Sequence, residues 1–282
     1  GLPFRSNNDL KMIAHLIKDT LSIDILCIQE VAIHNQLDER SVNLMLDTIV
    51  MHLGSNWEYF IIYNDNPKFE LEMQNAFLFN RSTIRLKQVF DLPVPIYTVG
   101  NKPLFDRLPL VGHFVSANND TDDEGFIIVN LHLASGQQYD ENHLAAMIIV
   151  EQNLKEALKK RNIIEPNRTS KYALQERLIL GDFNDNPFAL KDNGECCKYM
   201  DLMYQYMELR GYKNLVNSGF VSTRMSDNFN SIIDHVLVHN TLNKRVGEAI
   251  KYMPCEANDK ACFSEWRKAY SDHFLIYFDL GF

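Results

Sequence analysis

Residues 177–184 read Arg-Leu-Ile-Leu-Gly-Asp-Phe-Asn, a short apolar run that passes directly into a turn carrying an acid and an amide. Apolar runs of this length, bounded by turn residues, are typical of buried β-strands. An ordinary turn also explains the polar residues, because Gly181 tolerates positive φ and Asp182 and Asn184 can bond to their own backbone. The stretch therefore predicts a core strand with polar side chains at its C-terminal end.

The same arrangement recurs at four other places in the chain. Polar groups follow or end the first three predicted strands and begin the last two, and in antiparallel neighbours the end of one strand meets the start of the next. All five groups can therefore converge on one rim of a sheet. The other four are Gln29-Glu30 after residues 24–28, Asn130 and His132 in 126–133, Asp234 in 231–238, and Ser271-Asp272-His273 before 273–280.

The remaining segments alternate between helical and strand periodicity. Some predicted strands follow each other directly and others are connected by a helix. This mixture predicts one mixed-sheet α/β domain over residues 1–282. Helical spacing, with an Asn as the first N-cap, covers 7–21, 41–53, 141–160 and 195–209, and further strands cover 57–63, 76–79, 84–90 and 111–117.

Composition limits the class of partner. The 282 residues include 28 Lys and Arg against 37 Asp and Glu, a net charge of −9, and 46% are hydrophobic. No apolar run is long enough for a membrane span. An acidic surface repels a phosphate backbone, which argues against a passive nucleic-acid coat protein. An enzyme that acts on phosphates remains compatible, since bound cations reverse the local sign.

The five cysteines form no CxxC pair, so a zinc ribbon or a thioredoxin-like site is not supported. Adjacent Cys196 and Cys197 are not expected to bond to each other, and Cys27 lies in an apolar run. Cys255 and Cys262 can close a small disulfide loop if the protein is exported, and the alternative is two free thiols. The sequence opens without Met, as a processed or truncated chain would, and the compartment stays open with export slightly favoured.

In this order, the motifs QE, NxHL, GDFN, IDHV and SDH resemble those of the endonuclease/exonuclease/phosphatase superfamily over residues 24–278. The group contains pancreatic deoxyribonuclease, abasic-site endonucleases, sphingomyelinases and inositol-polyphosphate phosphatases. The resemblance implies a four-layered α/β sandwich, in which two mixed, mainly antiparallel sheets pack face to face with helices outside. It also implies a hydrolase of phosphate esters that depends on Mg²⁺ or Mn²⁺.

The resemblance assigns metal and phosphate contacts to five residues. Glu30 would ligate the divalent metal, with Asp272 as a second or water-mediated ligand. Asp182 would position or deprotonate the attacking water. Asn184 would donate a hydrogen bond to a phosphate oxygen, and Arg107, which precedes a predicted strand, would contact the phosphate.

Two imidazoles complete the implied site. Asp234 would pair with His273 and fix its tautomer, while His132 would be the second imidazole at the scissile phosphate, supported by Asn130. A histidine paired with a carboxylate can change protonation state near neutral pH. A zinc site that uses both histidines is the competing possibility, but no HxH or HExxH spacing supports it.

Three features depart from the family pattern. The family's first strand, which carries an active-site Asn, has no room before the helix at residue 7, so the domain is expected to lack it. The family often has a Glu shortly before the strand that is here residues 76–79, and this Glu orients the NxHL histidine. Here Glu72 and Gln74 are the candidates, and neither stands at the position that the family pattern gives. A common lysine after that histidine is replaced within residues 133–136.

These observations favour a metal-dependent phosphodiesterase or nuclease, expected to be a monomer, with DNA as one candidate substrate. The first alternative is a lipid or inositol-phosphate phosphoesterase on the same fold, and the second is a non-catalytic binding or toxin-like module. Cations that a nuclease needs are Lys102, Arg107 and Arg224, and apolar side chains that a lipid substrate needs are Phe188, Phe220 and Phe229.

Overall fold

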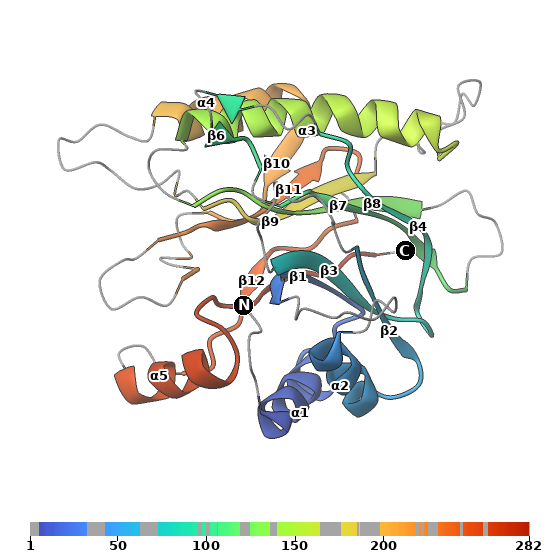
Figure 1. Ribbon diagram of the computed structural model, residues 1–282, viewed down its shortest axis with the longest axis vertical. Coiled ribbons are helices and arrows are strands. Elements are labelled where there is room, and N and C mark those ends of the chain that lie inside the picture. Colours follow the sequence, from blue (N-terminus) through green and yellow to red (C-terminus); the bar gives the residue numbers. More distant parts are fainter. Residues whose placement is uncertain are drawn as a thin grey trace.

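The chain folds into four layers, helices on the outside and two sheets within (Figure 1). This computed structural model agrees with the expected α/β sandwich. It describes residues 6–32, 43–62, 73–94, 98–99, 102–105, 107–118, 125–135, 140–163, 176–184, 186, 198–217, 220, 223–224, 231–242, 245–255 and 259–281.

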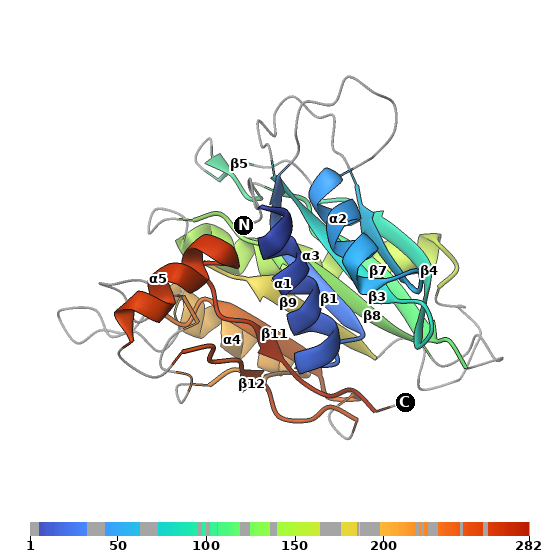
Figure 2. The ribbon, with the colours of Figure 1, turned by 90° about the horizontal axis from the view of Figure 1, so that it is seen from below.

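The smaller sheet has three antiparallel strands in the order β1-β3-β2. Helices α1 and α2 cover its outer face, as Figure 2 shows from below. A Ser6 capping box begins α1, where an Asn was expected, because the Ser6 hydroxyl accepts from the Asp9 backbone N–H. The bounds are α1 Asn7–His15, a π-turn η1 Leu16–Thr20, β1 Ile25–Ala32, α2 Leu44–Leu53, β2 Trp57–Ile61 and β3 Met73–Asn80.

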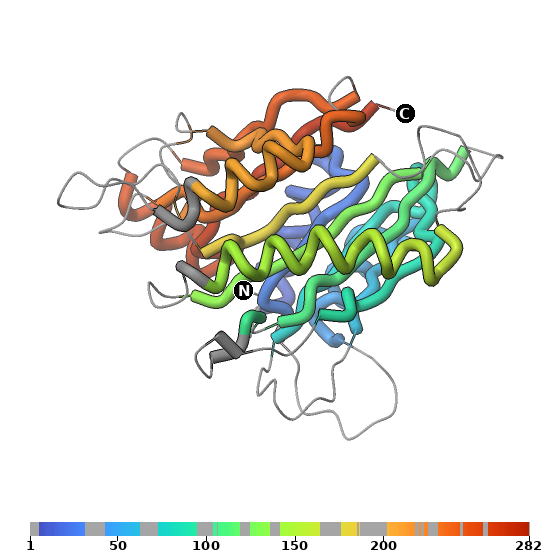
Figure 3. The backbone as a smooth tube through the Cα atoms, turned by 90° about the horizontal axis from the view of Figure 1, so that it is seen from above, coloured from blue at the N-terminus to red at the C-terminus, as the bar shows by residue number. Residues whose placement is uncertain are grey.

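The larger sheet has six strands in the order β10-β11-β9-β8-β7-β4. β8 and β9 run parallel, joined through α3, and the other neighbours run antiparallel. α3 crosses the outer face of this sheet (Figure 3). The bounds are β4 Ile84–Asp91, β7 Leu110–Ser116, β8 Gly125–His132, α3 Asp140–Lys160, β9 Arg177–Asp182, α4 Lys198–Leu209, β10 Tyr212–Asn214 and β11 Asp234–His239.

The C-terminal part differs most from the expectation. The long strand predicted over 273–280 contains only the short β13 Ile276–Tyr277, which pairs with β12 Ile250–Lys251. An unpredicted helix, α5 Lys260–Ala269, precedes it, and a disulfide joins Cys255 to Cys262. A small hairpin of β5 Thr98–Val99 and β6 Lys102–Pro103 was also not predicted.

Three apolar cores hold the layers together. One lies between α3, α4 and the large sheet, one between α1, α2 and the small sheet, and the third between the two sheets. Phe77 of β3 packs edge-on against Phe114 of β7 in this third core. Among the helices that the structure describes, none has both the length and the apolar character that crossing a bilayer requires.

Candidate active site

Asp182 and Asp234 stand opposite each other at the end of β9 and the start of β11. Their strands are antiparallel, so the C-terminal end of one meets the N-terminal start of the other, as the sequence pattern predicts. Two like charges in this position are unfavourable unless a cation or a proton compensates them. The pairing of β9 with β11 therefore places two carboxylates side by side, and a nearby positive charge would stabilise them.

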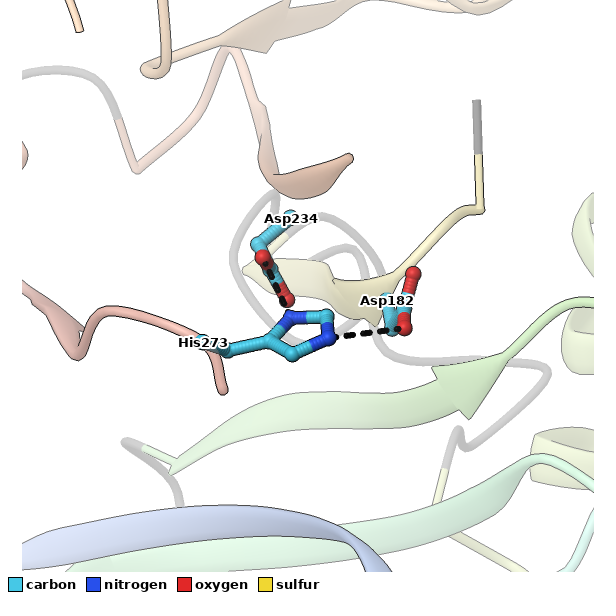
Figure 4. Close-up of side chains that lie close together, drawn as sticks. All are labelled: Asp182, Asp234 and His273. Atoms are coloured by element: carbon cyan, nitrogen blue, oxygen red, sulfur yellow. Dashed lines mark hydrogen bonds and ion pairs between the residues drawn. The ribbon is translucent and has the colours of Figure 1, made fainter. Parts of the chain in front are cut away.

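His273 lies between these two carboxylates (Figure 4). Its Nδ1 is 2.9 Å from Asp234 Oδ2, and its Nε2 is 3.8 Å from Asp182 Oδ2. The first distance is a hydrogen bond, which fixes the tautomer that carries a proton on Nδ1. The second is too long for a direct hydrogen bond and leaves the Nε2 edge facing Asp182.

His132, at the end of β8, approaches Asp182 from the other side. Its Nε2 is 3.6 Å from Asp182 Oδ2 and 3.9 Å from Glu30 Oε1. Within the described residues its buried Nδ1 has no hydrogen-bond partner. Gln74 is buried in β3 opposite Val31, and Glu72, the other expected partner, lies outside the described residues.

A β-bulge brings Glu30 to the site. β1 continues to Ala32 and does not end at Ile28 as expected, and its pairing with β3 shifts register between Ile28 and Val31. Glu30 has a φ of 57°, in the left-handed region that costs a non-glycine residue free energy. Bulges commonly redirect a side chain next to an active site, and this one places Glu30 Oε1 3.7 Å from Arg107 Nη2.

Asn130, for which a substrate contact and support of His132 are predicted, forms its side-chain hydrogen bonds with the small sheet. The residue is fully buried, and its Nδ2 donates to the carbonyls of Ile28 and Ala76 while its Oδ1 accepts from Gln29 Nε2. All three partners belong to the small sheet. Asn130 therefore ties β8 to β1 and β3, and it acts on the site through the position of β1.

The remaining expected residues surround this cluster. The Asn184 backbone N–H donates to Asp182 Oδ1, and its Nδ2 donates to the Leu133 carbonyl, which leaves one amide hydrogen. Asp272 Oδ2 lies 3.8 Å from Arg224 Nε. Phe220, one of the apolar residues proposed for a lipid substrate, packs against the core between the sheets. The other candidates, Phe188, Phe229 and the side chain of Lys102, lie outside the described residues, as does residue 136 in the segment where the family has a lysine.

Burial and neighbouring charges shift three pKa values here. Burial, with Asp234 adding to it, raises the pKa of the Asp182 carboxyl well above its usual range. Burial lowers the pKa of His132, and the Arg107 charge lowers it further. Burial acts to lower the pKa of His273, but the neighbouring carboxylates, Asp234 first and then Asp182 and Asp272, together outweigh it and raise that pKa to about 9.

Carboxylate and imidazole ligand atoms come together as a possible cation site. Among the described residues, Asp182, Asp234 and His273 offer ligand atoms within 4.8 Å of one another. Glu30 Oε1 lies 3.9 Å from His132 Nε2, next to this group. A set dominated by carboxylate oxygens suits a hard divalent cation such as Mg²⁺ or Mn²⁺.

Sequence reasoning did not identify Thr223, which is fully buried beneath the site. Its hydroxyl accepts from the backbone N–H groups of Ile233 and Asp234, and its carbonyl accepts from the Phe274 N–H. Thr223 therefore couples the start of β11 to the segment that carries His273. A single Thr in a polar loop carries no sequence signal of this role.

Asn75 was also missed. It is buried in β3, and its Nδ2 donates to the carbonyls of Leu108 and Asn130. Through these two bonds Asn75 connects β3 both to β8 and to Leu108, the residue next to Arg107. A polar Asn at this position of a strand whose other central residues are apolar is the feature of the sequence that could have indicated it.

Comparison by sequence finds no relative: no family model and no curated protein matches this chain.

Comparison by structure gives a consistent fold. An endonuclease/exonuclease/phosphatase family protein from Bacteroides thetaiotaomicron matches with a TM-score of 0.59 and 16% identity over 97% of this chain and 89% of its own. A mannosyl-6-phosphatase of the same species has a TM-score of 0.60 and 17% identity, covering 98% and 91%. The human Nocturnin catalytic domain with bound sulfate has a TM-score of 0.56 and 14% identity, covering 97% and 87%. The chain has the fold of the endonuclease/exonuclease/phosphatase proteins.

Proposed function

We propose that this chain, with its endonuclease/exonuclease/phosphatase fold, is a divalent-metal-dependent hydrolase of phosphate esters, and most specifically a phosphodiesterase. The observation that supports the proposal is the set of Asp182, Asp234, His273, His132 and Glu30 at one rim, with neighbouring members 2.9–3.9 Å apart. Solved structures of similar fold include a phosphatase.

Asp182 is suited to hold or deprotonate the attacking water. Its Oδ2 lies between the Nε2 atoms of His132 and His273, so a water bound there would have two imidazole neighbours. The raised pKa of Asp182 makes it a better proton acceptor than a free carboxylate. Asp234 holds His273 in one orientation through its hydrogen bond to Nδ1.

The charge that develops on the phosphoryl oxygens needs cations and donors. Arg107 is 11% exposed and, within the described part of the chain, its buried Nε has no partner, which makes it available to a phosphate. Glu30 and Asp272 are proposed to hold Mg²⁺ or Mn²⁺, with Asp182 beside them. When bound, the ion would neutralise phosphoryl charge and orient water.

The test is hydrolysis of plasmid DNA, abasic duplex, bis-p-nitrophenyl phosphate, sphingomyelin and inositol phosphates with Mg²⁺, Mn²⁺ or EDTA. Asp182→Asn and His273→Ala are expected to lower turnover by about 10³-fold or more, because each removes a proton-transfer partner. EDTA should abolish turnover and added Mg²⁺ should restore it.

Matched controls are Asp279→Asn and His15→Ala, since both residues are exposed and neither belongs to the proposed cluster. Unchanged rates in Asp182→Asn and His273→Ala would refute the proposed roles, and turnover indifferent to EDTA would remove the metal. Calorimetry separates the ligand sets: Glu30→Gln should weaken Mg²⁺ binding more than Asp234→Asn does if Glu30 is a ligand.

A further inference from the structure

Three short stretches of the chain have the pattern Asn-x-Ser or Asn-x-Thr, in which x is not Pro. This is the pattern at which N-linked glycans are attached in secreted proteins. The pattern also arises by chance, so the surroundings of the Asn side chain matter more than the pattern itself. The three stretches are Asn80-Arg81-Ser82, Asn119-Asp120-Thr121 and Asn167-Arg168-Thr169, and the first lies within the described residues.

The Asn80 amide has its nitrogen available and its oxygen in use. Asn80 is the last residue of β3, and a turn over residues 81–83 follows it. Its Oδ1 accepts from the Ser82 hydroxyl at 2.7 Å and from the Ser82 backbone N–H at 3.1 Å. Within the described structure its Nδ2 has no hydrogen bond. Nδ2 is the atom to which an N-linked glycan is attached.

The backbone of this turn is held without the Asn80 amide nitrogen. The Asn80 N–H donates to the Asp24 carbonyl, and the Asn80 carbonyl accepts from the Thr83 N–H. The Arg81 N–H donates to the Asn56 carbonyl. A substituent on Asn80 Nδ2 would therefore break none of the hydrogen bonds that hold the turn.

The surface beside Asn80 has room for a saccharide. Phe79 and Arg81, the residues on either side of Asn80 in the chain, line a surface groove of about 590 Å³. Phe60 of β2, which is 36% exposed, forms another part of its wall. A glycan on Asn80 would thus extend from a turn at the surface, next to a groove that the protein leaves unfilled.

Asn80 lies at the end of the molecule opposite the proposed active site. β3 begins at Met73, near the bulge that carries Glu30, and ends at Asn80. Since each residue extends a strand by about 3.3 Å, the two ends of β3 are roughly 23 Å apart. A glycan on Asn80 would therefore leave the rim accessible to substrate.

The other two patterns occur in connections that begin and end at this same end of the sheets. Residues 117–124 connect β7 to β8, and residues 161–176 connect α3 to β9. β8 and β9 are parallel and both finish at the rim, so their first residues, Gly125 and Arg177, lie at the opposite end. All three patterns thus belong to connections on the side away from the rim.

The disulfide between Cys255 and Cys262 supports the same conclusion independently of the pattern. Disulfides form and persist in oxidising compartments, of which the lumen of the endoplasmic reticulum is one. N-linked glycans are attached in that lumen. The disulfide and the Asn-x-Ser pattern therefore favour passage of the chain through one compartment.

We propose that Asn80 is an acceptor site for an N-linked glycan, transferred from a lipid-diphosphate-linked oligosaccharide. In the transfer, Asn80 Nδ2 forms a bond to C1 of the first sugar and releases one proton to solvent. The bond between C1 and the diphosphate oxygen breaks, and the lipid diphosphate leaves with the electron pair. Nothing is oxidised or reduced. The inference concerns modification and does not depend on the proposed hydrolysis.

The test is secretion of the chain from mammalian cells behind a signal peptide, followed by mass spectrometry of its peptides. Peptide-N-glycosidase in heavy-oxygen water converts a glycosylated Asn into Asp that carries the heavy isotope. We expect this label on Asn80 in most of the secreted molecules. The protein retained in the cells is measured as well, so that the result does not depend on the yield of secretion.

Matched variants separate the glycan from a change in the turn. Ser82→Ala removes the hydroxyl that the pattern requires and should abolish the label on Asn80, whereas Ser82→Thr keeps the pattern and should retain it. Thr83→Ala, one residue beyond the pattern, should not change the label. Absence of label on Asn80 in disulfide-bonded protein would overturn the proposal, even if Asn119 or Asn167 is labelled. Equal labelling of Asn80 in Ser82→Ala and Ser82→Thr would overturn it too.

Discussion

At the scale of single residues, the proposed chemistry depends on acids placed where their charge is costly. Asp182 is buried opposite Asp234, and the ring of His273 lies near both carboxylates. Thr223 stabilises this arrangement from below through two backbone N–H bonds. Two neighbouring carboxylates, both largely buried, cost stability, and the proposed proton transfer depends on both of them.

Asp91, at the end of β4, provides a pH test away from the site. Burial raises the pKa of its carboxyl to about 7, above the unfolded value of about 4. A raised acid pKa contributes stability that is fully present below pH about 4 and is lost as pH rises through 7. Asp91→Asn removes this loss, so its free energy of unfolding relative to the native chain should rise between pH 4.5 and 8 by about 3 kcal/mol.

Urea unfolding at the two pH values checks this expectation. Asp279→Asn, at an exposed position, should show no such rise. A constant difference between Asp91→Asn and the native chain at both pH values would show that the Asp91 carboxyl does not titrate in this range.

At the scale of elements, the parallel contact of β8 and β9 is unusually close at Gly181. Its φ is 140°, and a Cβ there would lie 1.9 Å from the Leu131 carbonyl oxygen. Gly181→Ala is therefore expected to lower the free energy of unfolding by about 3 kcal/mol or more. In Gly247→Ala the nearest atom would be 3.6 Å from the new Cβ, so this control should unfold like the native chain. Chemical denaturation of both variants decides the point.

The Asn130 side chain joins the two sheets in addition to their apolar core. Asn130→Ala removes three side-chain hydrogen bonds and leaves two carbonyls of the small sheet and the Gln29 amide without this partner. We expect a loss of about 3 kcal/mol in the free energy of unfolding, since each buried group left unsatisfied costs about 1–3 kcal/mol. Asn118→Ala, at an exposed position two residues after β7, is the control. A loss below about 1 kcal/mol would contradict the cross-sheet role.

At the scale of the whole molecule, the C-terminal segment depends on more than sheet pairing. Its short β13 and the exposed helix α5 bury little apolar surface, and the Cys255–Cys262 disulfide anchors the start of α5. Cys255→Ser/Cys262→Ser should destabilise the protein by about 2 kcal/mol, because the loop is short. Thermal unfolding with and without reductant checks this, and a reductant effect that persists in the double variant would assign it to other cysteines.

Net charge also acts at this scale. The −9 of the chain argues against tight binding to nucleic acid by the whole surface, whatever the site hydrolyses. Part of that charge, Glu30, Asp182 and Asp234, gathers at one rim with two imidazoles and Arg107. A local cluster of this kind is compatible with a phosphate ester once a cation is bound.

The sequence alone determined most of the helices and strands, and it showed at which ends of the strands the polar groups lie. Strand and helix periodicity are local properties, so most segments and the convergence of Asp182, Asp234 and His273 were predictable from apolar runs that end in acids or imidazoles. Whether Cys255 and Cys262 pair stayed open, because spacing does not determine the geometry of two side chains.

Only the tertiary structure showed the features of the site that depend on how distant strands pair and pack. The bulge that turns Glu30 toward His132, the burial of Asn130 against the other sheet and the support from Thr223 each need partners far apart in the chain. Local sequence carries no information on these contacts, because their free energy comes from the packing of one sheet on another.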